Sequence, residues 1–89
     1  MPYWLEISSD VRRQIERLPG HLRQPVKRIV AGLRLDPRPS GAMELRDRPG
    51  RWRIRLNDNW RLFYRIDEDR LTVTVLRVGR KTGPEFYAE

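Results

Sequence analysis

The spacing of apolar side chains near the start of the chain predicts an amphipathic helix. Val11, Ile15 and Leu18 recur at positions i, i+4 and i+7, with charged residues between them. Residues 8–10 (Ser-Ser-Asp) are all good helix N-caps, and the Pro-Gly pair at 19–20 is a strong stop signal. The pattern therefore predicts a first helix that begins near residues 8–10 and ends before residue 19.

A second helix is predicted directly after the first, because the same spacing continues. Its apolar positions are Leu22, Val26, Ile29, Val30 and Leu33. It is expected to end before the Asp-Pro pair at 36–37, and Pro25 is expected in its first turn, where a missing N–H costs little. Two helices joined by so short a link are typical of an αα-hairpin.

The other apolar segments have the period of two that is typical of strands. Strands are expected at 3–8, 43–45, 51–56, 60–66 and 71–78, with turns at 57–59 and 67–69. A short, mobile C-terminal segment is expected from Gly79 onward. These elements predict an α+β fold over residues 1–89 as a single domain. In it, an N-terminal strand and an αα-hairpin pack on a small, mainly antiparallel, twisted sheet.

The two strands on either side of the Asn-Asp-Asn turn form the most informative part of the sequence. If that turn is the hairpin loop, Arg55 faces Arg61, Arg53 faces Phe63, and Arg51 faces Arg65. The opposite face, packed against the helices, then carries Trp52, Ile54, Trp60, Leu62, Tyr64 and Ile66. Directly opposed like charges are unfavourable in a sheet, so folding alone gives no reason for this arrangement.

Clustered arginines on one sheet face indicate a partner with phosphate groups. The planar guanidinium fork matches phosphate oxygens, and the ring of Phe63 between the arginines can support a stacked base. Two simpler interpretations remain open. The arginines can pair with carboxylates elsewhere, or they can form the solvated face of an antiparallel sheet.

The composition agrees with an anionic partner but does not require one. Of the 89 residues 19 are Lys or Arg and 12 are Asp or Glu, which gives a formal charge of +7. Seventeen of the cations are arginine, and the two lysines are Lys27 and Lys81. This excess is typical of nucleic-acid binding, although a merely soluble surface also accounts for it.

Other classes of protein are excluded by what the chain lacks. It has no cysteine and a single histidine, His21, so it has neither a thiolate metal site nor a histidine metal cluster. No apolar stretch approaches the roughly 18 residues of a membrane span. We therefore expect a small cytoplasmic domain with no metal and no small-molecule cofactor.

Several segments, taken in order, resemble the RelE/ParE superfamily of bacterial toxins from type II toxin–antitoxin systems. The resemblance covers essentially the whole chain. It includes the αα-hairpin ending in LRLDPRP, a Leu45-Arg46 step before a Pro-Gly turn, the hairpin WRIRLNDNWRLFYRI, the strand VLRVGRK, and Tyr87 near the end. Each segment is weak alone, but the strand pair followed by VGRK is specific for the superfamily.

The resemblance implies a toxin closer to the RelE type, which is a ribosome-dependent mRNA endonuclease that cuts message in the A site. Arg61, Lys81 and Tyr87 then match catalytic positions, and Arg53 and Arg55 match RNA-binding positions. The arginine pattern adds Arg51, Arg65 and Arg80 to the RNA-binding set. RelE-type nucleases usually carry arginine at position 81, so the lysine keeps the charge there but not the fork, unless Arg80 supplies it.

The implied reaction needs no metal. The message's own 2′-OH attacks the adjacent phosphate, Tyr87 acts as general base, and Arg61 and Lys81 stabilise the charge on the phosphate. The expected partners are the ribosome, mRNA and an acidic cognate antitoxin, which would form a hetero-oligomer with the chain. Two alternatives remain: a ParE-type inhibitor of DNA gyrase without nuclease activity, and a fold that has lost its activity or binds structured RNA.

Overall fold

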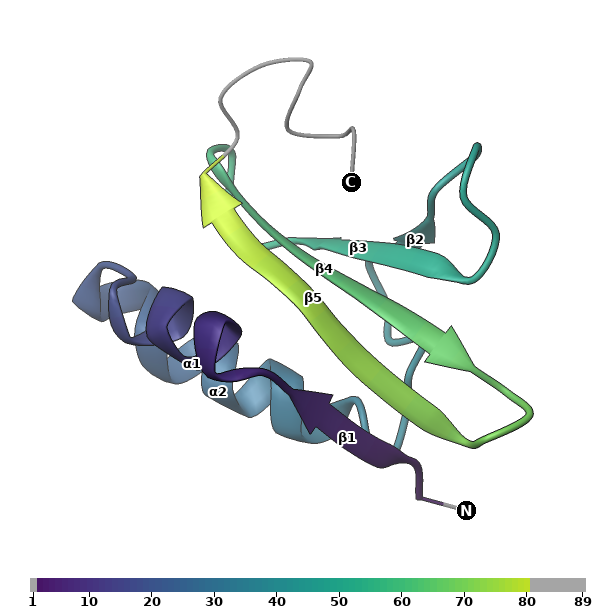
Figure 1. Ribbon diagram of the computed structural model, residues 1–89. Coiled ribbons are helices and arrows are strands. Elements are labelled where there is room, and N and C mark those ends of the chain that lie inside the picture. The colour runs from purple at the N-terminus through teal and green to yellow at the C-terminus, as the bar shows by residue number, and fades with distance from the viewer. Residues whose placement is uncertain (1, 81–89) are drawn as a thin grey trace.

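The structure is a computed structural model and describes residues 2–80. In chain order the elements are β1 (Trp4–Ile7), α1 (Ser9–Glu16), α2 (Gly20–Gly32), β2 (Ala42–Glu44), β3 (Arg51–Arg55), β4 (Trp60–Asp67) and β5 (Thr72–Arg80). Figure 1 shows α1 and α2 side by side as a hairpin on one face of a twisted sheet. The expected α+β fold is therefore confirmed.

The sheet has five strands in the order β1-β5-β4-β3-β2. β1 pairs in parallel with β5, and the other three pairings are antiparallel. The sheet is thus mainly antiparallel, as expected, with a parallel edge strand that the αα-hairpin connects to the rest. Within residues 2–80 neither helix is long and apolar enough to cross a membrane.

The two helices follow the predicted pattern, with one exception. The side chain of Ser8 accepts a hydrogen bond from the Val11 N–H at 3.2 Å, so Ser8 is the N-cap of α1. Helix α2 already begins at Gly20, which places Pro25 in its second turn rather than in the first. The prediction that Pro25 lies in the first turn was wrong, because the helix starts directly after Pro19 and its first turn ends before residue 25.

The core lies between the helices and the inner face of the sheet. It contains Val11, Ile15, Leu18, Leu22, Val26, Val30 and Leu33 from the helical hairpin, and Ile54, Leu62, Tyr64, Ile66, Val73, Val75 and Val78 from the sheet. Trp52 and Trp60 pack against it as predicted, whereas Trp4 is 75% exposed. β1 is an edge strand that turns Leu5 and Ile7 toward the helices, and this leaves Trp4 on the other face.

The predicted register of the central hairpin is confirmed at every pair. β3 and β4 align Arg51 with Arg65, Trp52 with Tyr64, Arg53 with Phe63, Ile54 with Leu62, and Arg55 with Arg61. The bounds of β5 differ from those predicted. Leu71 has φ +48° and belongs to the turn, and the strand continues through Gly79 to Arg80 because β4 extends to Trp60, which pairs with Arg80.

A polar cluster links the loop after α2 to the turn that follows β4. Glu68, in the turn after β4, accepts hydrogen bonds from Arg38 at 2.5 Å and from the Tyr3 hydroxyl at 2.8 Å. The Arg38 guanidinium also lies 5.3 Å from the centre of the Trp52 ring. The hydrogen bond from Arg38 lowers the pKa of Glu68. Glu68, in the acidic turn at 67–69, therefore links the loop after α2 and the start of β1 to the end of β4.

Tyr64 gives the fold a dependence on alkaline pH. Its buried hydroxyl donates to the Pro37 carbonyl at 2.7 Å, and burial raises its pKa to about 12. Because the unfolded chain loses this proton near pH 10, the stabilisation is complete below pH 10 and is lost as the pH rises toward about 12. It amounts to at most about 3 kcal/mol.

Replacing Tyr64 by phenylalanine is expected to remove that dependence. Tyr64→Phe should cost about 1–2 kcal/mol at neutral pH, because the Pro37 carbonyl is left without its donor. Urea unfolding between pH 7 and about 12 measures both effects. If the variant and the wild type lose stability equally above pH 10, another group controls the alkaline transition.

Candidate nucleic-acid interface

The face of the sheet that points away from the helices gathers six arginines around one aromatic residue. Pairing in the sheet sets this composition, because residues directly opposite each other lie on the same face. We call this surface the arginine face and define it as Arg51, Arg53, Arg55, Arg61, Arg65 and Arg77 around Phe63. Five of the six come from the predicted hairpin strands, and Arg77 comes from β5.

The arginine face is organised in three rows that cross the strands. The first row runs from Arg55 through Arg61 to Gly79, the second from Arg53 through Phe63 to Arg77, and the third from Arg51 through Arg65 to Thr74. The second row extends to Met43 on β2, whose sulfur lies 3.6 Å from a terminal nitrogen of Arg53. Cations thus occupy both sides of the central strand.

The arginine face is not uniformly open to solvent. Arg61 is only 5% exposed and Phe63 only 1% exposed, whereas Arg55 and Arg65 are exposed. A ring with so little accessible surface offers no plane for a stacked base in this conformation. The expectation that Phe63 supports a base is therefore not met. The accessible chemistry of this face consists of guanidinium groups.

Arg61 is bound to the turn of its own hairpin. Its Nη1 donates to the carbonyl of Asn57 at 2.6 Å and to the carbonyl of Trp60 at 3.0 Å. The side-chain oxygen of Asn57 accepts in addition from the N–H groups of Asn59 and Trp60. Arg61 and Asn57 together hold the β3–β4 turn closed, while the buried Nε of Arg61 has no hydrogen-bond partner.

This placement predicts a structural cost for removing Arg61. Arg61→Ala removes a charged donor from two carbonyls and is expected to destabilise the fold by about 2–3 kcal/mol. Thermal or urea unfolding measures the change. Arg65→Ala is the matched control, since Arg65 is exposed on the same strand, and should stay within about 0.5 kcal/mol of the wild type. Equal stability of the two variants would contradict the bracing role of Arg61.

The remaining predicted site residues fall into two groups. Arg80 pairs with Trp60 and lies two residues beyond the buried Val78, so it belongs to the helix-covered side of the sheet and not to the arginine face. Lys81 and Tyr87 lie outside the described residues. The structure therefore brings together Arg51, Arg53, Arg55, Arg61 and Arg65 from the predicted set.

Arg77 is the residue of this face that the sequence interpretation missed. A regular alternation from Val73 and Val75 would place residue 77 in the core. In the structure the alternation breaks after Val75, and Arg77 lies beside Phe63. The available signal was Val78, an apolar residue that does not fit the alternation set by Val73 and Val75.

The accessible arginines are suited to binding an anion. Arg55 forms an exposed ion pair with Asp58 in the adjacent turn, a contact that competes weakly with a stronger anionic ligand. Planar guanidinium groups from neighbouring strands can contact successive phosphate oxygens. Within residues 2–80 no group of three or more His, Asp or Glu side chains is placed to hold a metal ion.

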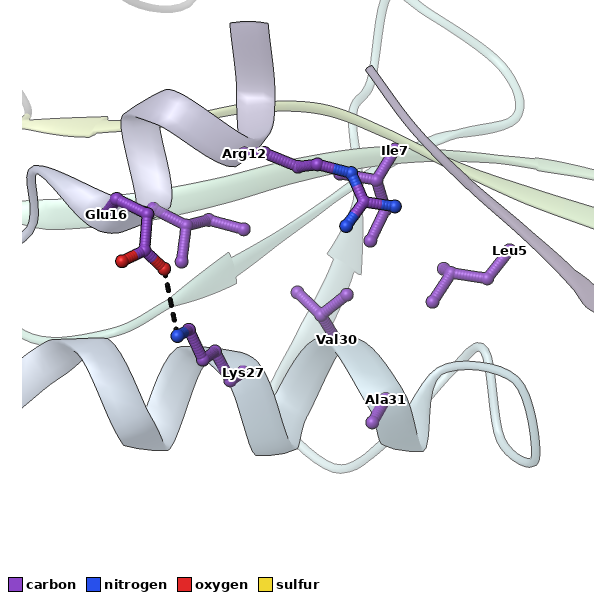
Figure 2. A pocket seen from close by; sticks show the side chains of 8 residues that line it. Leu5, Ile7, Arg12, Glu16, Lys27, Val30 and Ala31 are labelled. Atoms are coloured by element: carbon purple, nitrogen blue, oxygen red, sulfur yellow. Dashed lines mark ion pairs between the residues drawn. The ribbon is translucent and has the colours of Figure 1, made fainter. Parts of the chain in front are cut away.

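A hollow lies on the opposite side of the molecule, between β1 and the helical hairpin. It has a volume of about 450 Å³, and its apolar lining comes from Leu5, Ile7, Ile15, Val30 and Ala31. Figure 2 shows Arg12 extending over it and Glu16 paired with Lys27 at its rim, at 2.9 Å. The hydrogen bond from Lys27 lowers the pKa of Glu16. This groove shares no residue with the arginine face.

Comparison with known proteins agrees with this fold and surface. Residues 5–82 match the family model for the ParE toxin of type II toxin–antitoxin systems. The chain is similar to the mRNA interferase toxin RelE of Escherichia coli, with 27% identity over 100% of this chain and 94% of the relative. It is also similar to the toxin RelG of Mycobacterium tuberculosis, with 32% identity over 91% and 93% of the two chains.

Solved structures give the same result. A mutant of the Escherichia coli toxin RelE in the free state superposes with a TM-score of 0.79 at 26% identity, over 100% of this chain and 94% of the other. The toxin–antitoxin complex RelBE2 from Mycobacterium tuberculosis gives a TM-score of 0.71 at 31% identity, over 91% and 100%. The chain therefore belongs to the ParE toxin family of type II toxin–antitoxin systems and, within the RelE/ParE superfamily, is closer to RelE.

Proposed function

We propose that this toxin is a ribosome-dependent mRNA endonuclease that cleaves message in the A site. The observation that carries the proposal is that a relative aligned over the whole chain is an mRNA interferase. The arginine face supports it independently, because residues 51–66 hold five arginines and one acid, a local charge of 5 − 1 = +4. A strand of RNA is the polyanion that such a surface fits.

The proposed chemistry uses the message's own 2′-OH as the nucleophile. Its oxygen attacks the adjacent phosphorus, the bond to the 5′-oxygen breaks, and that oxygen takes up a proton from water, so that the products are a 2′,3′-cyclic phosphate and a free 5′-hydroxyl. Tyr87 is proposed to take the proton from the 2′-OH as general base. Lys81 and Arg61 are proposed to stabilise the charge on the phosphate, while Arg53 and Arg55 hold the backbone.

The position of Arg61 adds a second effect to its proposed role. Since its Nη1 is engaged with the hairpin turn, Arg61 also fixes the spacing of Arg55 and Arg53 on the neighbouring strand. A loss of cleavage in Arg61→Ala therefore combines chemistry with destabilisation. Tyr87→Phe is the cleaner probe, because it removes only the proposed base.

The experiment is single-turnover cleavage of message in programmed ribosomes, followed by toeprinting and by analysis of the product ends. Wild type should leave a 2′,3′-cyclic phosphate, and Tyr87→Phe should cut about 10²–10⁴-fold more slowly, as expected for loss of a general base. An unchanged rate in Tyr87→Phe would remove Tyr87 from the mechanism. No cleavage by the wild type would refute the nuclease proposal.

An acidic antitoxin is the proposed partner in the resting complex. Related toxins have been solved as the complex RelBE2 and as RelE with an antitoxin RelB peptide, at 31% and 25% identity to this chain. The formal charge of +7 and the arginine face favour an acidic segment that covers the same surface as RNA. Action on translating ribosomes would place the toxin in the cytoplasm. Competition between antitoxin and message is then the expected form of control.

Gyrase inhibition of the ParE type is the competing activity. The relatives named above are RelE and RelG toxins rather than gyrase inhibitors, so this reading is not favoured. A supercoiling assay with excess toxin separates the two functions. Inhibition of supercoiling without cleavage of message would reverse the assignment.

A further inference from the structure

Arg77 owes its place on the arginine face to an irregularity in the pairing of β4 with β5. Along the first part of β5 the register aligns Ile66 with Val73 and Tyr64 with Val75. The next pair is Phe63 with Arg77, so Leu76 is an extra residue that has no pairing partner on β4. This is a β-bulge, and beyond it every side chain of β5 changes face relative to a regular strand.

Without the bulge the two faces would carry different residues. Continuing the register of Tyr64 and Val75 would align Phe63 with Leu76 and Leu62 with Arg77. Arg77 would then point into the apolar core, and Val78 would lie on the arginine face. The extra residue therefore exchanges these positions. It puts Val78 in the core, where it is 4% exposed, and Arg77 beside Phe63.

A contact with helix α1 also stabilises the shifted register. β1 ends at Ile7, whose partner is Val75, so the rest of β5 has no strand on that side. Gln14 of α1 takes over there, and its side-chain oxygen accepts a hydrogen bond from the Val78 N–H at 3.0 Å. Burial of Val78 and its hydrogen bond to Gln14 both fix the strand in the register that presents Arg77.

A sixth arginine at this position increases the concentration of positive charge on the arginine face. Arg77 joins a face that already holds five arginines, and neighbouring like charges are unfavourable in a sheet. Bulges often re-aim a side chain at functional sites. With strands about 4.8 Å apart, Arg53 and Arg77 stand roughly 10 Å from each other across Phe63, a spacing that a bound nucleic-acid backbone can bridge.

We propose that Arg77 is an RNA-binding residue that contacts a backbone phosphate of the message from the side of the arginine face opposite Arg53. The proposal rests on the proposed function and extends it to a strand outside the arginine hairpin. It assigns to the β5 bulge the task of widening the cationic surface from two strands to three.

Salt dependence of binding tests this assignment, with a short fluorescein-labelled single-stranded RNA oligonucleotide as the probe. Fluorescence anisotropy between about 50 and 200 mM salt gives the slope of log K against log salt concentration. Arg77→Gln should weaken binding roughly tenfold and reduce the slope by about 0.7, the contribution of one phosphate on a single strand. Arg77→Lys should keep the slope, because it keeps the charge.

Arg28→Gln is the matched control, since Arg28 is exposed on α2 and far from the arginine face in the fold. If Arg77→Gln has the slope and affinity of Arg28→Gln, the assignment is overturned, and it is overturned too if the wild type binds no RNA. Thermal unfolding of each variant shows whether the fold is retained, and Arg77→Ser, a second uncharged replacement with the same expected loss of slope, carries the test if Arg77→Gln unfolds. Wild-type binding with the expected slope but no cleavage in ribosomes would refute the nuclease function alone.

Discussion

Replacing Arg53 and Arg55 together by glutamine is expected to slow the cleavage of ribosome-bound message by roughly 10²–10⁴-fold. The two side chains lie on β3 in adjacent rows of the arginine face. A hydrogen bond to a charged group contributes about 1.5–3 kcal/mol, and the double variant removes one such contact at each position. Single-turnover cleavage in programmed ribosomes measures the loss.

The same substitutions should leave the fold almost unchanged. Arg55 is exposed and its ion pair with Asp58 lies at the surface, where such pairs contribute about 0–1 kcal/mol. The control replaces two exposed arginines of the helical hairpin, Arg17 at the C-cap of α1 and Arg28 on α2, and removes the same charge from another face. Equal loss of cleavage in both double variants would mean that total charge, rather than the arginine face, determines activity.

Leu62→Ala is expected to have the largest effect on stability. Leu62 is fully buried on the central strand β4, between Ile54 and Val78. Removing its side chain should cost about 2–5 kcal/mol, which is a large share of the roughly 5–15 kcal/mol available to a small domain. The melting temperature should fall by roughly 10–25 °C, as measured by calorimetry or circular dichroism.

Leu35→Ala is the matched control for that prediction. Leu35 follows α2 and is 76% exposed, so the same truncation should change stability by no more than about 0.5 kcal/mol. A similar fall in both variants would show that Leu62 does not have the central position in the core that the register gives it.

Local patterns in the sequence were sufficient to predict the elements and the central hairpin. The alternation of Trp52 and Ile54 with arginines fixes which face of β3 is buried, and the Asn-Asp-Asn turn then fixes the register with β4. The helices followed from apolar spacing and from the Ser8 cap. Each of these signals lies within one or two neighbouring segments.

Features that depend on the tertiary fold were not predictable in the same way. The burial of Arg61 depends on a turn that curls back over its guanidinium, and the exposure of Trp4 depends on β1 being at the edge of the sheet. The bulge that places Arg77 arises where β4, α1 and the end of β1 meet β5. In these cases the sequence pattern involves neighbouring residues, whereas the exposure of the side chain is decided by how strands and helices meet in the fold.

Burial also changes which residues of the candidate site are accessible. The alternation in the sequence places the five hairpin arginines on one face but does not give their exposure. In the structure Arg61 and Phe63 are buried, and Arg55 and Arg65 are exposed. The roles of Lys81 and Tyr87 continue to rest on the resemblance to RelE-type toxins. Mutagenesis should therefore address the residues of the arginine face and, separately, Lys81 and Tyr87.

Cleavage of one labelled message in the presence and absence of ribosomes is the direct test of the proposed ribosome-dependent nuclease activity. The toxin is incubated with the message alone, with ribosomes stalled on a defined codon, and with the same ribosomes after the A site has been filled by tRNA. We expect a single cut at the A-site codon in the second reaction and little or none in the other two. Equal cleavage of the free message, or no cleavage in any reaction, would contradict it.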